Sequence, residues 1–179
     1  MGKFRFRKIA DVDKTMEKDR IPYMAGLLDG EGGFSIKITK RKPPRFQAHI
    51  SLQHTHEDTV SKFAEWCGVD SQNRLGRKGR RLYYTRINTQ EDLRKLLEML
   101  QPWLITKKKH AELILEFLSL TRELQSSAKT LDPSRERSIR SEQVDIYIDL
   151  RKLNPKDPQA RHVDYEKLRE ELHKELAQS

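Results

Sequence analysis

The ten residues Tyr23-Met24-Ala25-Gly26-Leu27-Leu28-Asp29-Gly30-Glu31-Gly32 join a short apolar stretch to two carboxylates separated by glycine. Pro22, just before them, suits the first turn of a helix, where a missing N–H loses no partner. We expect this helix to run to about residues 28–30, where glycines end it. Acidic groups are unfavourable at the negative end of a helix dipole, so Asp29 and Glu31 need a compensating cation. A divalent metal fits, because hard cations take carboxylate and carbonyl oxygens; an ordinary helix end with two solvated acids is the alternative.

Two segments with alternating apolar residues follow this helix. Residues 34–41 and 45–53 each place apolar side chains at every second position, which is typical of half-buried strands. Pro43 and Pro44 lie between them, so the pair is predicted to form a hairpin with one apolar and one polar face. A second hairpin is predicted over residues 72–87, around a basic turn that contains Gly76 and Gly79.

Helices account for most of the remaining chain. Thr55 and Thr89 are each followed three residues later by an acid, so both are predicted to cap helices, the first ending at Gly68 and the second at Pro102. A long amphipathic helix is expected at about 106–124. After a serine-rich basic link at 126–138, two more helices are expected at about 139–153 and 163–177. The predicted fold class is α+β, with a small antiparallel sheet that keeps one polar face.

The distribution of charge indicates a polyanionic partner. The chain carries 36 Lys and Arg against 27 Asp and Glu, a net charge of +9, and no acid lies between Glu31 and Glu57 or between Asp70 and Glu91. Both acid-free stretches fall on the predicted hairpins; chance clustering in a basic protein is the alternative. Charge alone leaves an acidic membrane surface open, but no apolar run approaches the ~20 residues of a spanning helix. Residues 1–19 lack the apolar core of a signal peptide. Cys67 is the only cysteine, which excludes an intrachain disulfide. We therefore expect an intracellular protein.

At this point the residues carry a resemblance to a known family. Residues 24–32, MAGLLDGEG, resemble the LAGLIDADG motif of homing endonucleases, with Met for the leading Leu and Glu for the final Asp. Residues 100–111, LQPWLITKKKHA, are similar to the family segment in which a Leu-Gln-Pro-aromatic-Leu run precedes a catalytic lysine. The likeness covers about 21–124. It implies an αββαββα core over 21–125 whose sheet forms a DNA-binding saddle, between a basic arm at 1–20 and C-terminal helices at 126–179.

The resemblance also implies an active site for metal-dependent hydrolysis of phosphodiesters. It assigns Mg²⁺, with Mn²⁺ as a substitute, to the Glu31 carboxylate and the Gly30 carbonyl, and it assigns to Asp29 a supporting role that ties down the partner helix. Glu in place of Asp at position 31 adds one methylene. Lys107 corresponds to the lysine that stabilises the transition state, although the basic run there also suits a helix cap or a phosphate contact. Gln53 and His56 correspond to polar residues that order waters; for His56, a first-turn helix position without a catalytic part is the alternative.

Only one copy of the motif is present, and single-motif chains of the family act as homodimers paired through the motif helices. The small residues Ala25, Gly26 and Gly30 suit that contact. A symmetric dimer reads a nearly palindromic site on double-stranded DNA. The polar strand faces are expected to bind that DNA, through Ser35, Lys37, Thr39, Arg41, Arg45, Gln47, His49, Ser51, Arg74, Arg77, Lys78, Arg80, Tyr84 and Arg86.

The predicted function is a site-specific homing endonuclease, intron-encoded because no splicing domain flanks the core. It would act in the cytoplasm or nucleoid, or in an organelle if its gene lies in an organellar intron. The alternative is an RNA maturase or a non-cleaving DNA-binding regulator on the same fold.

Overall fold

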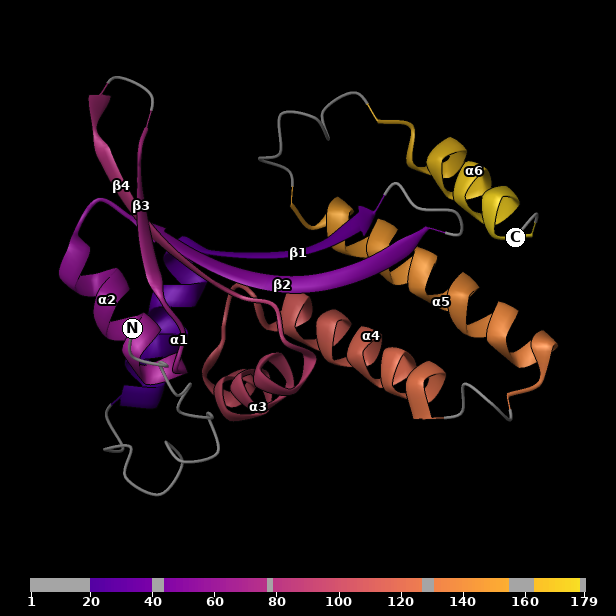
Figure 1. Ribbon diagram of the computed structural model, residues 1–179, viewed down its shortest axis with the longest axis horizontal. Helices are drawn as coiled ribbons and strands as arrows, with labels where there is room; N and C mark the ends of the chain where they lie inside the picture. The colour runs from indigo at the N-terminus through magenta and orange to yellow at the C-terminus, as the bar shows by residue number, and fades with distance from the viewer. Residues whose placement is uncertain (1–19, 40–43, 77–78, 127–130, 155–162, 178–179) are drawn as a thin grey trace, which may run out of the picture. The chain divides into compact units, whose positions relative to one another are not determined.

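The structure is a computed structural model that describes residues 20–39, 44–76, 79–126, 131–154 and 163–177. The predicted basic N-terminal arm therefore lies almost entirely outside the described residues. Figure 1 labels the helices and strands along the chain, with the exception of η3. The elements are α1 (Arg20–Glu31), β1 (Gly32–Thr39), β2 (Arg45–His54), α2 (Glu57–Cys67), β3 (Ser71–Leu75), β4 (Arg81–Ile87), α3 (Gln90–Leu100), the short 3-10 helix η3 (Gln101–Trp103), α4 (Lys108–Ser126), α5 (Pro133–Lys152) and α6 (Tyr165–Ala177).

The predicted αββαββα order and α+β class are confirmed. The strands form one sheet in the order β1-β2-β4-β3, so the two hairpins meet where β2 lies beside β4. Those two strands are antiparallel, with Ser51 opposite Arg86 and Gln53 opposite Tyr84. β3 pairs with β4 in the second hairpin, placing Gln72 opposite Tyr84. Side chains directly opposite one another share a face, so this half of the sheet presents one polar face, as the alternation predicts.

Contacts group the chain into two compact units. The first comprises Met1–Phe34 and His49–Ala111, and the second comprises Ser35–Ala48 and Glu112–Ser179. In the first unit, α1, α2 and α3 supply a buried apolar core together with the inner face of β2 and β4. Its fully buried members include Met24, Leu28, Leu52, Phe63, Ile87, Leu93, Leu96, Leu97 and Leu100. Burying each such side chain contributes about 1.5–3 kcal/mol, and this core fixes the orientation of α1, on which the candidate site depends.

The helix ends are partly as predicted. α2 stops at Gly68, whose φ of 65° lies in the left-handed region that glycine adopts without cost. The prediction that Thr55 caps α2 is wrong: His56 occupies the cap position, and its backbone N–H donates to Nδ1 of His54 at 3.0 Å. Thr89 does precede α3, but its hydroxyl donates to the Asp92 carboxylate rather than capping the backbone. Local side-chain bonds have replaced the expected caps in both turns.

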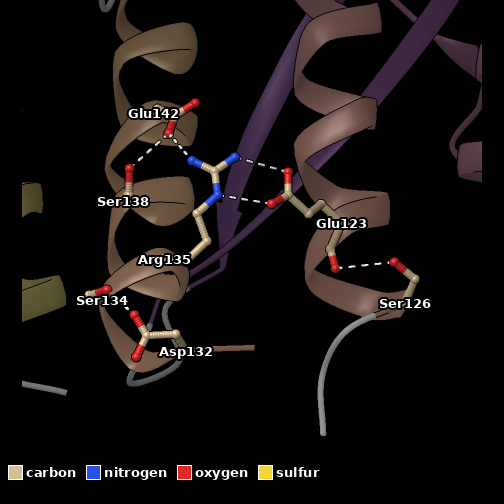
Figure 2. A network of polar contacts seen from close by, with 7 residues as sticks. All are labelled: Glu123, Ser126, Asp132, Ser134, Arg135, Ser138 and Glu142. Carbon is tan, nitrogen blue, oxygen red and sulfur yellow. Dashed lines mark hydrogen bonds and ion pairs between the residues drawn. The ribbon is translucent and has the colours of Figure 1, made fainter. Parts of the chain in front are cut away.

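In the second unit, α5 begins at Pro133 and not at about 139, so the predicted serine-rich link is shorter than expected. Proline is favoured in the first helical turn, and Arg135, two residues later, is held by two carboxylates. Figure 2 shows its guanidinium between Glu123 of α4, at 2.9 and 3.0 Å, and Glu142 of α5, at 3.2 Å. The hydrogen bond and charge of Arg135 lower the pKa of the Glu123 carboxyl. Ion pairs between residues far apart in the sequence thus stabilise the first turn of α5, which the local sequence pattern did not predict.

Within the described parts of the chain, no helix combines the length and the apolar character that crossing a bilayer requires.

Candidate active site and nucleic-acid interface

The C-terminal end of α1 is hydrogen-bonded to the segment that leads into α4. Asp29 accepts the backbone N–H of Ile105 through Oδ2 at 2.7 Å and that of Lys107 through Oδ1 at 2.9 Å. These amides lie at the start of a helix, where N–H groups lack intrahelical acceptors and a negative charge is favourable. Within its own chain, Asp29 thus holds residues 105–107, and its role toward a partner helix stays a prediction. The two N–H groups reach Asp29 because residues 105–107 pass directly beside the helix end.

Lys107 supplies positive charge at the same place. Its Nζ donates to the backbone carbonyl of Leu28 at 2.9 Å and, in a short hydrogen bond, to that of Gly32. The last carbonyls of a helix lack intrahelical donors and form the negative end of its dipole. The sequence requires a compensating cation at this end, and the ammonium group of Lys107 meets part of that requirement.

Glu31, the last residue of α1, is exposed to solvent. The chain turns tightly after it, because a Cβ on Gly32 would lie 2.5 Å from the carbonyl oxygen of Leu28. Within the described residues, no three His, Cys, Asp or Glu side chains come together to hold a metal. Because Asp29 is bound to backbone amides and Lys107 covers two carbonyls, one chain offers mainly the Glu31 carboxylate and the neighbouring Gly30 carbonyl to a cation. That is a partial ligand set, since Mg²⁺ prefers six oxygens.

Gln53 lies close to this end of α1. β1 and β2 are neighbours in the sheet, and a Cβ on Gly33 would come within 2.9 Å of the Ser51 hydroxyl. In an antiparallel pair, that approach places the backbone of Gln53 near the junction of α1 and β1. Lys107 is bonded to the end of α1 that carries Glu31, and the grouping of Glu31, Gln53 and Lys107 in one active site stays a prediction.

Polar side chains joined by hydrogen bonds cover the polar face of β2, β4 and β3. Arg74 donates to Oε1 of Gln53 at 2.8 Å, and its guanidinium lies 5.5 Å from the centre of the Tyr84 ring. Tyr84 in turn donates to Oε1 of Gln72 at 2.6 Å. These four side chains line a cavity of about 760 Å³ together with Ser51 and Arg86. Sequence reasoning missed Gln72, although it shares strand parity with Arg74 and so could have been assigned to the same face.

The remaining residues predicted to bind DNA are placed as follows. Lys37, Arg45, Gln47, Arg80 and Arg86 are exposed, while Ser35, Thr39, Ser51 and Tyr84 are half-buried. Arg41, Arg77 and Lys78 lie outside the described residues. The expected exposure of His49 is wrong, because only 7% of this residue is accessible to solvent. It takes part in an interaction within the chain, and such a partner is what allows a polar ring to leave water.

His56 is exposed at the start of α2, where its ring stacks on that of His54 with the centres 5.1 Å apart. Its position at the first turn of a helix agrees with the alternative we left open, and a catalytic part for it stays a prediction.

The three residues of α1 that were assigned to a dimer contact differ in their exposure to solvent. Ala25 is completely buried in the core of its own chain, so its assignment to the interface is wrong. Gly26 and Gly30 are exposed, and a Cβ built on either meets nothing within 4 Å. They are one helical turn apart, so together they leave a bare strip of backbone on the outside of the helix. Tyr23, which is 52% exposed, lies on the same side.

Comparisons with known proteins agree with this geometry. A family model described as LAGLIDADG endonuclease matches residues 24–116, which is more than half of the chain. No curated protein matches by sequence. The archaeal intron-encoded homing endonuclease I-Vdi141I, solved in complex with DNA, is 17% identical with a TM-score of 0.70, over 91% of this chain and 100% of that chain.

Two further solved structures differ in how much of them this chain covers. The homing endonuclease I-CvuI, solved with a DNA target in the presence of Mg, is 17% identical with a TM-score of 0.66, over 89% of this chain and 96% of that chain. The LAGLIDADG meganuclease I-AabMI, bound to uncleaved DNA, is 23% identical with a TM-score of 0.51, over 69% of this chain but only 43% of that chain. At these identities the likeness shows the fold.

Proposed function

The chain belongs to the LAGLIDADG endonuclease family, and from this membership we propose that it is a site-specific homing endonuclease that cleaves double-stranded DNA with Mg²⁺ as a homodimer. The observation that carries the proposal is the exposed carboxylate of Glu31 at the end of α1, beside a polar sheet face and a fixed lysine ammonium. An acid held in the open at the negative end of a helix has no use in the fold itself. It suits a site that binds a cation when substrate arrives.

DNA is the partner that the charge and the sheet face favour. The net charge of +9 attracts a polyanion, and the face that carries Gln53, Gln72, Arg74 and Arg86 offers amide and guanidinium groups that can bond to base edges and phosphates. The relatives I-Vdi141I and I-CvuI were solved bound to DNA. Phosphate contacts would dominate affinity, so binding is expected to weaken steeply as salt rises.

Each residue of the site has a distinct task in hydrolysis. Glu31 and the Gly30 carbonyl would hold Mg²⁺, which activates a water and neutralises charge on the leaving oxygen when it is bound. Lys107 keeps the helix end in place and maintains positive charge beside the scissile phosphate. Gln53, whose side-chain oxygen is taken by Arg74, retains its amide hydrogens to orient a water. The carboxylate of Asp29 fixes the segment that carries Lys107.

A homodimer completes this site. One chain provides a partial ligand set, and a two-fold partner packed on Gly26 and Gly30 would bring a second Glu31 close to the first. The chain covers all of I-Vdi141I but less than half of I-AabMI. Two copies would read a nearly palindromic site and cut both strands. The gene would be carried by an intron, and the protein would act wherever the target DNA lies, inside the cell or an organelle.

The test is Glu31→Gln, with Glu65→Gln on the exposed side of α2 as a matched control. A target is first selected from a random DNA library by cleavage with the wild-type protein and Mg²⁺. The Glu31 variant should then cleave that target at least about 10²-fold more slowly, as expected when a group that stabilises the transition state is lost. Binding measured without catalysis should stay within a few-fold, and the control should cleave normally. If Glu31→Gln cleaves DNA at the wild-type rate, the assignment of Glu31 to the active site is wrong. A wild-type protein that protects an intron RNA and nicks no DNA with any divalent metal would point to a maturase instead.

A further inference from the structure

Three polar side chains form a row across the sheet. Gln53 of β2 lies opposite Tyr84 of β4, and Tyr84 lies opposite Gln72 of β3. Adjacent strands are about 4.7–4.9 Å apart and opposite residues share a face, so the three side chains stand next to one another on the polar face. Gln72 is exposed and lines the cavity on that face. Its carboxamide is therefore accessible to the edge of a base.

The hydroxyl of Tyr84 fixes which end of the Gln72 carboxamide faces it. The phenolic oxygen lies 2.6 Å from Oε1 of Gln72. That separation is typical of an O–H···O bond and is shorter than the roughly 2.9–3.0 Å that an amide N–H donor prefers. The tyrosine therefore donates to the carboxamide oxygen. Among the described residues no acceptor holds the amide hydrogens of Gln72, so these remain for a ligand.

Tyr84 is itself held in place by Arg74. The guanidinium of Arg74 lies 5.5 Å from the centre of the tyrosine ring and donates to Oε1 of Gln53 at 2.8 Å. A cation over an aromatic face is attracted to it, and Tyr84 is half-buried, so its ring has little freedom to turn. The orientation of the Gln72 carboxamide is thus set before DNA binds, which lowers the entropic cost of a base contact.

A glutamine oriented in this way favours a different base from an unrestrained glutamine. An unrestrained glutamine binds adenine through two bonds, in which its oxygen accepts from N6 and its nitrogen donates to N7. The bond from Tyr84 turns Oε1 of Gln72 toward β4, so this pair of bonds forms only if the tyrosine bond breaks. The amide hydrogens require acceptors. Guanine is the base whose major-groove edge presents two acceptors, N7 and O6, and no donor.

We propose that Gln72 reads a guanine of the target site as a hydrogen-bond donor, and that Tyr84 is the positioning residue that sets this preference. The inference rests on the proposed endonuclease function and deepens it, because it names the base edge that one position of the site requires. Tyr84 acts through the Gln72 carboxamide, and the base preference changes when its hydroxyl is removed even though its ring stays in place.

The experiment selects bound sequences from a randomised double-stranded DNA library, with Ca²⁺ in place of Mg²⁺ so that binding is scored apart from cleavage. The wild type should select guanine at one position where Gln72→Ala discriminates no base. Tyr84→Phe should raise the ratio of adenine to guanine at that position at least about fivefold, the equivalent of roughly 1 kcal/mol. The matched control is Tyr83→Phe, which makes the same change on the opposite face of β4 and should leave the preference unchanged. Gln72→Glu keeps the bond from Tyr84 but offers acceptors, so it should select cytosine.

The outcomes separate this inference from the proposed function. The inference is overturned if Tyr84→Phe, folded by circular dichroism, selects the same bases as the wild type, or if Tyr83→Phe shifts the preference equally. It is also overturned if Gln72→Ala weakens binding to all sequences alike, which is how a phosphate contact behaves. Should Tyr84→Phe fail to fold, selection by Gln72→Ala and Gln72→Glu, both altered at an exposed residue, decides the question. Cleavage of the selected sites by the wild type with Mg²⁺ is measured separately, and its absence would refute the endonuclease proposal while leaving the base preference intact.

Discussion

Replacing Lys107 by methionine tests whether the ammonium group at the end of α1 is part of the fold. Methionine keeps an unbranched side chain of similar length and removes the three N–H donors. The carbonyls of Leu28 and Gly32 then lose their partner, at the helix end where uncompensated negative charge is most concentrated.

The structure sets the size of the effect. A hydrogen bond from a charged donor contributes about 1.5–3 kcal/mol to stability. Two such bonds share one ammonium group, and Lys107 is half-buried, so water can replace part of what is lost. We therefore expect the free energy of unfolding to fall by about 2–4 kcal/mol. For a chain of this size that corresponds to a decrease in Tm of roughly 5–15 °C.

Urea unfolding followed by circular dichroism measures this difference, with Lys108→Met as the matched control. Lys108 is the next residue along the chain and is exposed, so its replacement should change stability by no more than about 0.5 kcal/mol. If Lys107→Met unfolds at the same urea concentration as the control, the assignment of Lys107 as the counter-charge of α1 is wrong. Cleavage measured well below the Tm of the variant then shows separately whether the ammonium group also acts on DNA.

Three further predictions follow from the packing and the charges. Gly32→Ala should destabilise the protein by about 1–3 kcal/mol, since its Cβ would overlap the backbone of α1, whereas Gly26→Ala, with open space around it, should leave thermal unfolding of the monomer unchanged or slightly raised. Burial raises the pKa of the Cys67 thiol far above its usual range, so a thiol reagent near pH 8 should label it only as fast as the protein unfolds; rapid labelling of folded protein contradicts the assignment. The bond to Arg135 lowers the pKa of Glu123, so the stability it contributes is present at neutral pH and is lost as pH falls through that lowered pKa. The stability difference between wild type and Arg135→Met should therefore shrink as the solution is acidified below the usual pKa of a glutamate, and a difference independent of pH would refute the pairing.

The sequence by itself determines the order and type of the core elements. These signals involve only residues that are near one another in the chain. They include the alternation of apolar residues at Phe34, Ile36 and Ile38, the same alternation in β2, and the turn glycines at 68 and 79. Such signals depend on the period of a strand or helix and on the conformations open to one residue, so they can be read without knowing what packs against them. The carboxylates at the end of α1 and the acid-free hairpins are local in the same sense, and the prediction of an active site there rests on them.

Only the tertiary structure decides which side of each element faces what, and which distant groups meet. Ala25 and Gly26 are both small and adjacent, yet one is buried in the core and the other lies bare, because the packing of α1 against its neighbours sets the rotation of the helix. Lys107 reaches the carbonyls of residues more than seventy positions earlier, and Arg74 reaches Gln53 from a different hairpin. A pattern along the chain carries no record of these pairs, because the free energy that forms them comes from bringing whole elements together and removing their surfaces from water.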